Sequence, residues 1–321
     1  MTGGGPLPLG LFATAGAGAG QISPLLWGLI WLSVVIAVLI ALAVVVGIAI
    51  RARRERDPKL VPVSRSGNGL PLIYGGVGLS ILILLALTGW TVTVIAGIAK
   101  PSAPAAFSVD VSARQWWWAF HYDDPDSGKA FTTANELHIP VGQAVAFNLT
   151  SPDVIHSFWV PALGGKTDVI PGQTNTMWLE ADKAGVYRGQ CSEYCGQQHA
   201  NMALYVVAEP AAQYASWRTV QAAPAKPPVT AQTEAGLADF IGRCGNCHTV
   251  RGTPARGDKG PDLTHLMSRS TIAAGLLDNA PGNLAGWIAH PQGLKPGSLM
   301  PDIALSGPEF EAILAYVETL K

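Results

Sequence analysis

Two long, uncharged apolar runs occupy most of the first third of the chain. The first extends from Ile22 to Ile50 and the second from about Leu70 to Ala99. Each run is long enough to cross a hydrocarbon core of about 30 Å as a tilted helix. Residues 22–100 are therefore predicted to form a transmembrane helical hairpin, with helices at about 22–50 and 70–99.

The segments beside these runs predict how the hairpin is oriented. Residues 1–21 are rich in Gly and Ala, carry no charge and are expected to be a flexible leader; a signal peptide would need a positive n-region, which they lack. The positive-inside rule places the basic loop between the two runs in the cytoplasm, so both termini should face the outer, periplasmic side of a bacterial inner membrane. The basic residues of this loop are Arg51, Arg53, Arg54, Arg56, Lys59 and Arg65, against Glu55 and Asp57.

After Pro101 the pattern changes to short segments that alternate between apolar and polar residues, separated by Pro and Gly turns. Examples are Phe107–Val111, Glu136–Ile139 and Ala144–Leu149. This alternation predicts an antiparallel β-sandwich over residues 101–210. The Ala- and Pro-rich residues 211–232 predict a semi-extended linker, and residues 233–321 a helical domain that closes with an amphipathic helix.

The composition excludes one broad class of function. Hydrophobic residues make up 49% of the chain and charged residues only 13%, as membrane segments would require. The formal net charge of -1 excludes a generally basic nucleic-acid-binding protein. The four cysteines form two close pairs, Cys191 with Cys195 and Cys244 with Cys247, and each pair lies in a ligand-type motif.

The first cysteine pair belongs to a loop that also contains His199 and Met202. Thiolate, imidazole and thioether donors favour copper over cations that prefer oxygen. A mononuclear blue-copper centre has no use for a second Cys, whereas two copper ions that share Cys191 and Cys195 would use both thiolates. His156, which follows a Ser-Pro-Asp turn, is the best candidate for the second terminal nitrogen. A disulfide between the two cysteines, or a closed zinc site, is the alternative.

The second pair lies in Cys244-Gly-Asn-Cys247-His248, the attachment signature of a c-type haem. In this signature both thiols form thioethers with the haem, and the adjacent His becomes the proximal iron ligand. Half of a zinc site is the alternative, with His265 and His290 as the nearby partners.

The residues from about Gln115 to Glu209 closely resemble the dinuclear copper (CuA) domain of cytochrome c oxidase subunit II. The matching segments are Gln-Trp-Trp-Trp, Asn-Glu-Leu-His-Ile-Pro-Val-Gly, Ser-Pro-Asp-Val-Ile-His-Ser-Phe-Trp-Val-Pro, Gly-Lys-Thr-Asp-Val-Ile-Pro-Gly and Cys-Ser-Glu-Tyr-Cys-Gly. The resemblance implies a cupredoxin-like fold with Cys191 and Cys195 as bridging thiolates. It also implies one copper bound by His156 and Met202 and another bound by His199 and the backbone carbonyl of Glu193.

The same resemblance implies roles for two further side chains. It makes Trp116 the residue of electron entry, whereas a strand that packs Trp116 and Trp118 into the core is the structural alternative. It also implies that the Glu193 side chain helps to hold magnesium at the border with subunit I; the alternative is a carboxylate that only shapes the copper loop. His121 and His138 lie outside any ligand motif and are expected to be structural or surface residues.

The C-terminal domain resembles a class I cytochrome c. The distal iron ligand of that family is a Met in a late loop, and Lys295-Pro-Gly-Ser-Leu-Met300-Pro matches this pattern. Met300 is therefore predicted to be the distal ligand, while Met267, in an apparent helix, is the competing residue and is expected to lie in the core. Trp287 is expected to pack against the haem.

The whole chain thus resembles subunit II of a caa3-type cytochrome c oxidase: a multidomain membrane protein with a transmembrane hairpin, a cupredoxin-like β-sandwich and an all-α class I cytochrome c domain. The resemblance implies electron transfer from an external donor, such as a cytochrome c or a bc1-type complex, through covalently bound haem c and dinuclear copper to subunit I, where O2 is reduced to water. Subunit III is a further expected partner. No residue of this chain is expected to act as an acid, base or nucleophile.

Two alternative functions stay open at this point. Many subunit II sequences carry a Glu near the start of the second helix, and residues 67–74 contain no acid. This departure favours the CuA subunit of a nitric oxide reductase as one alternative. A stand-alone, membrane-anchored electron-transfer protein is the other, although Gly75, Gly76 and Gly78 indicate packing against a neighbouring helix.

Overall fold

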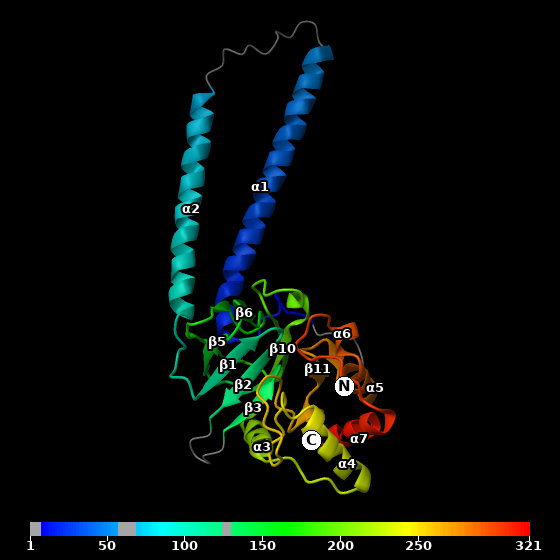
Figure 1. The fold of residues 1–321 in the computed structure, drawn as a ribbon. Coiled ribbons are helices and arrows are strands. Elements are labelled where there is room, and N and C mark those ends of the chain that lie inside the picture. Colours follow the sequence, from blue (N-terminus) through cyan, green and yellow to red (C-terminus); the bar gives the residue numbers. More distant parts are fainter. Residues whose placement is uncertain (1–7, 57–68, 124–129) are drawn as a thin grey trace. The chain divides into compact units, whose positions relative to one another are not determined.

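The computed structural model describes residues 8–56, 69–123 and 130–321. The chain forms two compact units, one of Gln21–Lys100 and the other of Met1–Gly20 with Pro101–Lys321 (Figure 1). Lys59, Arg65 and Asp57 of the expected basic loop lie outside the described residues.

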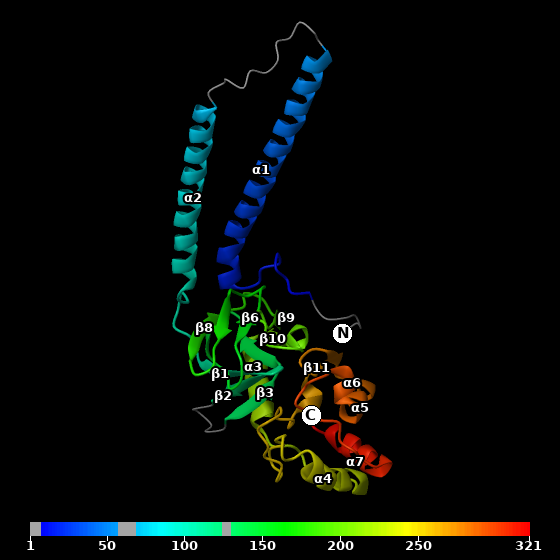
Figure 2. The same ribbon diagram turned by 45° about the horizontal axis from the view of Figure 1, so that its top comes forward.

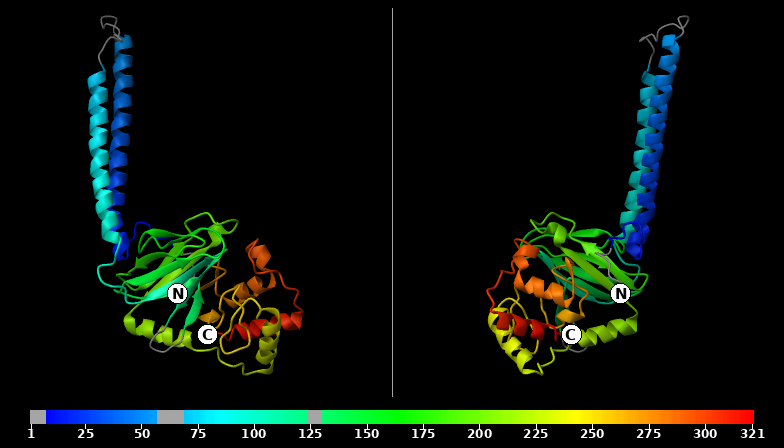
Figure 3. Two further views of the ribbon diagram at one scale, coloured as in Figure 1. Left: turned by 60° about the vertical axis from the view of Figure 1, so that its left-hand side comes forward. Right: turned by 90° about the vertical axis from the view of Figure 1, so that its right-hand side faces the viewer.

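The first of these units is a pair of long helices, α1 (Ala17–Arg56) and α2 (Leu70–Ile98). Both are long and apolar enough to cross a membrane, and no residue of their most apolar windows is buried in the structure. The helices run side by side (Figure 3). A Cβ at Gly28 would lie 2.8 Å from the Trp90 ring, so Gly28 allows close packing of α1 against that ring.

The segment expected to be a flexible leader makes ordered contacts where the structure describes it. The amide of Ala15 donates to the carbonyl of Ala162 at 2.7 Å, and Gly16 forms a β-bridge with Ala181. A Cβ at Gly16 would lie 2.5 Å from the carbonyl oxygen of Glu180, so only glycine allows this approach. Because α1 begins at Ala17, it starts earlier than the predicted 22.

The β-sandwich is built from a larger and a smaller sheet with a short hairpin beside them. The larger sheet has the order β3-β2-β1-β5-β8, the smaller one β4-β10-β9, and the hairpin pairs β6 with β7. The sheets are mixed and not purely antiparallel as predicted, since β1 pairs with β5, and β10 with β4, in parallel. The strands are β1 (Ser108–Arg114), β2 (Trp117–Tyr122), β3 (Phe131–Ala134), β4 (Glu136–Pro140), β5 (Val145–Thr150), β6 (His156–Trp159), β7 (Lys166–Val169), β8 (Asn175–Leu179), β9 (Gly185–Gln190) and β10 (Ala203–Glu209).

The predicted linker is wrong over its first half, because residues Ala211–Ala222 form helix α3. Two aromatic side chains fix this helix on the β-sandwich. Tyr214 stacks on Phe107 with ring centroids 5.6 Å apart, and Trp217 stacks on His138 at 4.0 Å. The prolines of the predicted linker all follow this helix, and alanine itself favours a helix, so aromatic burial adds to a local helical preference.

The C-terminal domain consists mainly of α4 (Ala231–Arg243), α5 (Pro281–Ala289), α6 (Pro291–Leu294) and α7 (Gly307–Val317). It is not strictly all-α, because β11 (Thr271–Ile272) and β12 (Leu277–Asp278) form a short hairpin. Helices α4 and α7 lie against each other (Figure 2). Gly236 permits this packing, since a Cβ there would lie 2.0 Å from the carbonyl oxygen of Ala312.

Candidate metal centre and haem cavity

The predicted copper loop is held at both ends by backbone hydrogen bonds. It joins β9 to β10 and contains one 3-10 turn, His199–Asn201. The amide of Cys191 donates to the carbonyl of Met202 at 3.0 Å, which closes the base of the loop. The amide of Ser192 donates to the carbonyl of Ser157 at 3.0 Å, which joins the loop to β6, the strand that begins at His156.

This arrangement brings the sequence-predicted donors together. The Sγ atoms of Cys191 and Cys195 lie 3.7 Å apart, and His156 Nδ1 lies 3.9 Å from Cys191 Sγ. Cys195 Sγ is 3.5 Å from His199 Nδ1 and 3.8 Å from Met202 Sδ. Donors held about 2.0–2.3 Å from a tetrahedral metal ion lie roughly 3.3–3.8 Å apart, so these spacings are close to those of a shared metal site.

The two thiols interact strongly even without a metal ion. The hydrogen bond from Cys195, followed by the contact with His156, lowers the pKa of the Cys191 thiol despite its burial. The same hydrogen bond, together with burial, raises the pKa of Cys195. A thiol deprotonates outright when it coordinates a metal ion, so a bound cation would replace the proton held between the two sulfurs.

Asp153 fixes the orientation of the His156 ring. Its carboxylate Oδ1 lies 2.9 Å from His156 Nε2, and the ring itself is completely buried. With the proton on Nε2, donated to the carboxylate, Nδ1 is left free to face Cys191 and bind a metal ion. Asp153 was missed as a functional residue at the sequence level, although the Ser-Pro-Asp turn that contains it was recognised.

The backbone carbonyl and the side chain of Glu193 lie in different surroundings. Its carbonyl oxygen lies 3.2 Å from Cys191 Sγ, within the donor cluster. Glu193 as a whole is exposed, as is Asp168 on β7. The Glu193 carboxylate is therefore accessible from outside this chain.

Trp116 connects the copper loop with a second candidate site. The residue is 8% exposed. It lies in the turn just before β2, so the strand expected to contain it begins one residue later, at Trp117. The indole Nε1 donates to the carbonyl of Cys195 at 2.9 Å, and Gln115 Nε2 donates to the same oxygen at 2.7 Å. Trp116 also lines the large cavity described next.

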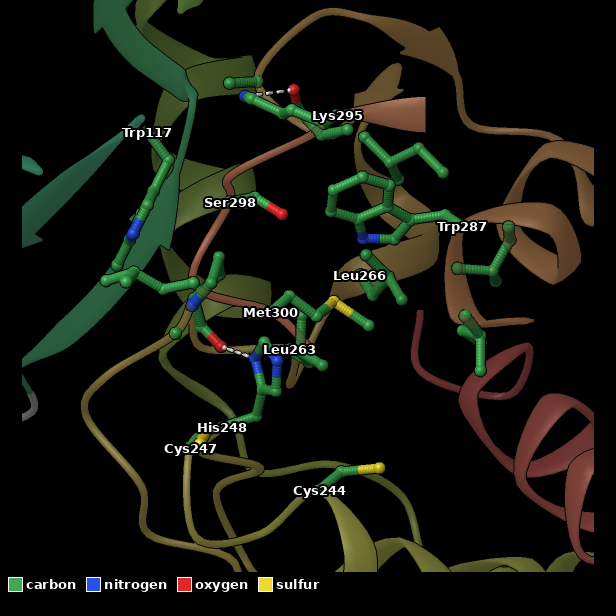
Figure 4. Close-up of a pocket in the computed structure, with 18 of the residues that line it drawn as sticks. Trp117, Cys244, Cys247, His248, Leu263, Leu266, Trp287, Lys295, Ser298 and Met300 are labelled. Carbon is green, nitrogen blue, oxygen red and sulfur yellow. Dashed lines mark hydrogen bonds between the residues drawn. The ribbon is translucent and has the colours of Figure 1, made fainter. Parts of the chain in front are cut away.

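This cavity, of about 490 Å³, lies between the C-terminal helical domain and the β-sandwich. All of the predicted haem-binding side chains line it, and Figure 4 shows the Met300 thioether and the His248 ring entering it from neighbouring positions. Trp287 lines it as expected, and Met267 is not among its lining residues. The predicted haem-binding residues are Cys244, Cys247, His248 and Met300.

The His248 ring is prepared for a metal ion by its surroundings. Its Nδ1 lies 2.8 Å from the carbonyl oxygen of Pro261, which leaves Nε2 free (Figure 4). Burial lowers the pKa of His248 and favours the neutral, ligating form. Gly260 makes room for the ring, because a Cβ there would lie 2.6 Å from His248 Cε1.

The loop that carries Met300 is braced by a residue that sequence reasoning missed. Gln292 Nε2 donates to the carbonyl of Met300 at 2.6 Å and to that of Ser298 at 2.8 Å, while its Oε1 accepts from the amide of Gly297 at 2.9 Å. The apolar cavity, two cysteines beside a free imidazole nitrogen, and a fixed thioether together fit a covalently attached haem.

His121 and His138 behave as predicted for structural or surface residues. His138 is buried between Glu136, at 3.3 Å, and Glu209, at 3.0 Å. His121 lies near the surface, 3.0 Å from Thr132 Oγ1 and 3.2 Å from a carboxylate oxygen of Asp123.

Comparison with known proteins gives a family for each of the two domains. Residues 126–209 match the family model described as cytochrome c oxidase subunit II, periplasmic domain, and residues 233–321 match cytochrome c. A cytochrome c oxidase subunit 2 of Alkalihalophilus pseudofirmus is 36% identical over 85% of this chain and 80% of its own length. The subunit 2 of Bacillus subtilis is 30% identical over 94% of this chain and 90% of its own length.

The periplasmic domain of subunit II of the Bradyrhizobium japonicum oxidase is a solved structure with 32% identity and a TM-score of 0.35, covering 38% of this chain and 96% of that one. The subunit II match implies copper, and the cytochrome c match implies haem c. With two relatives aligned over most of their length, the chain belongs to the cytochrome c oxidase subunit II family, in the form that carries a fused cytochrome c domain.

Proposed function

We propose that this chain is the electron-entry subunit of a terminal respiratory oxidase. Electrons from an external donor enter at haem c, pass to dinuclear copper and continue to the haem-copper subunit I, which reduces O2 to water. One observation carries this proposal: Trp116 lines the haem-type cavity and also donates its indole proton to the carbonyl of Cys195 in the copper loop. Trp116 thus contacts both candidate centres.

In this proposal the loop holds two copper ions, which together accept and release one electron. Cys191 and Cys195 would help to hold both ions, His156 and Met202 would bind one of them, and His199 and the Glu193 carbonyl would bind the other. The donor spacings of 3.5–3.9 Å around the two sulfurs support this assignment. The burial of both cysteines excludes water from the site and keeps the donor geometry fixed when the charge changes.

The haem group, when bound, supplies a one-electron iron couple. Cys244 and Cys247 would attach it, His248 would bind the iron through Nε2, and Met300 would be the distal ligand. Met300 lines the cavity, as His248 does, and the three hydrogen bonds of Gln292 hold its loop in place.

The position of the chain in a larger complex follows from the same proposal. Subunit I, and with it subunit III, would surround the hairpin α1–α2 in a bacterial inner membrane, with both redox domains and both termini on the periplasmic side. The exposed carboxylate of Glu193 would help to hold magnesium at the border with subunit I. A cytochrome c or a bc1-type complex would be the donor.

Purification of the complex with a metal and haem inventory tests the proposal. We expect two copper ions for each covalent haem c in this chain, a separate haem-bearing subunit, and oxygen uptake that exceeds nitric oxide turnover. One copper per chain would contradict the dinuclear site. Strong nitric oxide turnover with negligible oxygen uptake would assign the complex to the reductases, and isolation without a partner would make the chain a stand-alone carrier.

The distal haem ligand has a separate test with a matched control. Met300→Ala should abolish methionine-type ligation and lower the haem potential, whereas Met267→Leu should leave both unchanged, because Met267 is partly buried against the core of the domain and does not line the cavity. An unchanged spectrum and potential in the Met300 variant would reject this ligand.

A further inference from the structure

A lysine of the cytochrome c domain is buried against the β-sandwich. Lys295 begins the loop that leads to Met300, and only 3% of its surface is exposed. Its Nζ lies 2.9 Å from the carbonyl oxygen of Trp116, 2.7 Å from that of Asn201 and 2.9 Å from that of Ala273. A lysine ammonium has three donors, so these three carbonyls satisfy all of them.

The three carbonyls belong to segments that matter for both candidate centres. The indole of Trp116, in the turn before β2, contacts Cys195. Asn201 belongs to the 3-10 turn of the copper loop, directly before Met202. Ala273 lies at the tip of the β11–β12 hairpin in the cytochrome c domain. The single ammonium therefore joins the Met300 loop to the Trp116 turn and to the copper loop.

The tip of the hairpin is held in an unusual conformation that provides one of these contacts. Ala273 and Ala274 have φ of 55° and 62°, a region that alanine rarely adopts. The carbonyl of Ala273 accepts from Lys295, and the carbonyl of Ala274 accepts from the amide of Ala203 at 3.1 Å. Disfavoured backbone of this kind persists where surrounding contacts hold it, and here one contact lies within the cytochrome c domain and the other, from Ala203, comes from the β-sandwich.

The residues after Lys295 pack directly on the copper loop. Gln198 Nε2 donates to the carbonyl of Pro296 at 2.8 Å. Gly297 has φ of 80°, and a Cβ there would lie 2.6 Å from Gln197 Oε1 and 3.8 Å from the Trp116 ring. The positive φ of Gly297 favours glycine at this position, where the loop meets Gln197 and Trp116.

We propose that Lys295 is a positioning residue, whose ammonium fixes the Met300 loop against Trp116 and the copper loop and so sets the separation of haem and copper for internal electron transfer. The inference rests on the proposed function of both centres. The chain between α3 and α4 keeps the two domains close together, but a tether raises the local concentration without fixing orientation. Burying an ammonium is unfavourable unless its hydrogen bonds are satisfied, and three carbonyls from three segments satisfy it only in this one arrangement.

The test uses the complete complex with Lys295→Met, which keeps the chain length and removes the charge. Haem c is reduced by a light pulse, and its reoxidation is followed together with the near-infrared absorbance of the copper centre. Burial lowers the pKa of Lys295 to about 7, so the measurement is made near pH 6, where the amine is protonated. We expect internal transfer to slow by about tenfold or more, because the docked arrangement becomes a smaller share of the population.

The spectra and potentials of the two centres should stay at their wild-type values, which distinguishes positioning from a structural role. Lys226→Met removes the same charge from an exposed position and should leave the rate unchanged. Lys295→Gln, which keeps one amide donor group, provides a second and milder variant that should lie between wild type and Lys295→Met.

Three results would overturn the inference or its basis. A wild-type transfer rate in either Lys295 variant would show that the ammonium does not set the separation. Loss of copper or haem from both variants would show that the residue builds the centres and does not position them. No internal transfer in the wild-type complex would instead refute the proposed function.

Discussion

Asp153 holds the His156 ring in the candidate copper centre, and its replacement should weaken copper binding by a factor that the structure allows us to estimate. The carboxylate accepts hydrogen bonds from His156 Nε2 at 2.9 Å, from the amide of Val154 at 2.6 Å and from the amide of Gln115 at 2.7 Å. Asp153→Asn keeps the size of the side chain but turns one acceptor oxygen into an NH2 group. At least one of these donors then loses its partner.

The expected magnitude follows from the strength of one such contact. A hydrogen bond to a charged group contributes about 1.5–3 kcal/mol, and every 1.4 kcal/mol corresponds to about tenfold in affinity. Asp153→Asn should therefore lower copper affinity by about 10- to 100-fold, which is the range typical of residues that orient metal-binding histidines. Asp153→Ala removes every contact of the carboxylate and should lie at the upper end of that range.

Competition of the purified protein with a copper chelator, followed through the near-infrared band of the centre, measures this affinity. Asp110→Asn is the matched control, because Asp110 is exposed on β1 and its side chain accepts from Asn148 Nδ2 at 2.7 Å. The control should bind copper as the wild type does. Wild-type affinity in Asp153→Asn would show that something other than this carboxylate orients the ring.

Three further predictions concern stability. Gly236→Ala should destabilise the cytochrome c domain by about 1–3 kcal/mol or more, since the added Cβ overlaps Ala312. Gly242 lies on the same helix with open space around it, so Gly242→Ala should stabilise the domain by about 0.4–1 kcal/mol. Thermal unfolding compares the two variants. Burial opposes both shifts, but hydrogen bonds with each other and with their neighbours lower the pKa of Glu136 and raise that of His138. The stability that Glu136 contributes is lost as pH falls through its lowered pKa, and the stability that His138 contributes is lost as pH rises through its raised pKa. Both contributions are complete between pH 4.5 and 6.5, the ordinary pKa values of the two groups. The free energy of unfolding measured against pH would contradict this if it rose outside that window. Removal of copper should lower the melting temperature of the β-sandwich, because the ion binds only the folded loop, and calorimetry with and without a chelator measures the difference.

The parts of the protein that could be predicted from sequence are those encoded locally. The membrane-type helices follow from uninterrupted apolar runs, which no tertiary contact needs to support. Five of the six candidate copper donors lie within twelve residues of one another, between Cys191 and Met202, and the haem-attachment motif lies within five, between Cys244 and His248. At such short spacing the donor types themselves limit what the segment can bind.

Tertiary contacts explain where the sequence predictions differ from the structure. The prolines of residues 211–232 favour an extended linker, but all of them follow α3, whose alanines favour a helix, and Tyr214 and Trp217 find aromatic partners on the β-sandwich. Likewise, the leader lacks any local signal for order, yet Gly16 fits against the backbone of residues 163 and 180. In both cases the partner lies far away in the sequence, so no local pattern could reveal it.

The tryptophan pair before and within β2 shows why the core and functional interpretations of one motif need not exclude each other. Trp118 is fully buried in the core, and its indole still reaches the carbonyl of Met202 at 3.5 Å. Trp116 is buried as well, and its indole donates to the carbonyl of Cys195. Packing in the core restricts both rings, and through these hydrogen bonds it also restricts the loop that holds the candidate ligands. A buried aromatic pair can therefore give a redox loop the rigidity that keeps its geometry constant when an electron arrives.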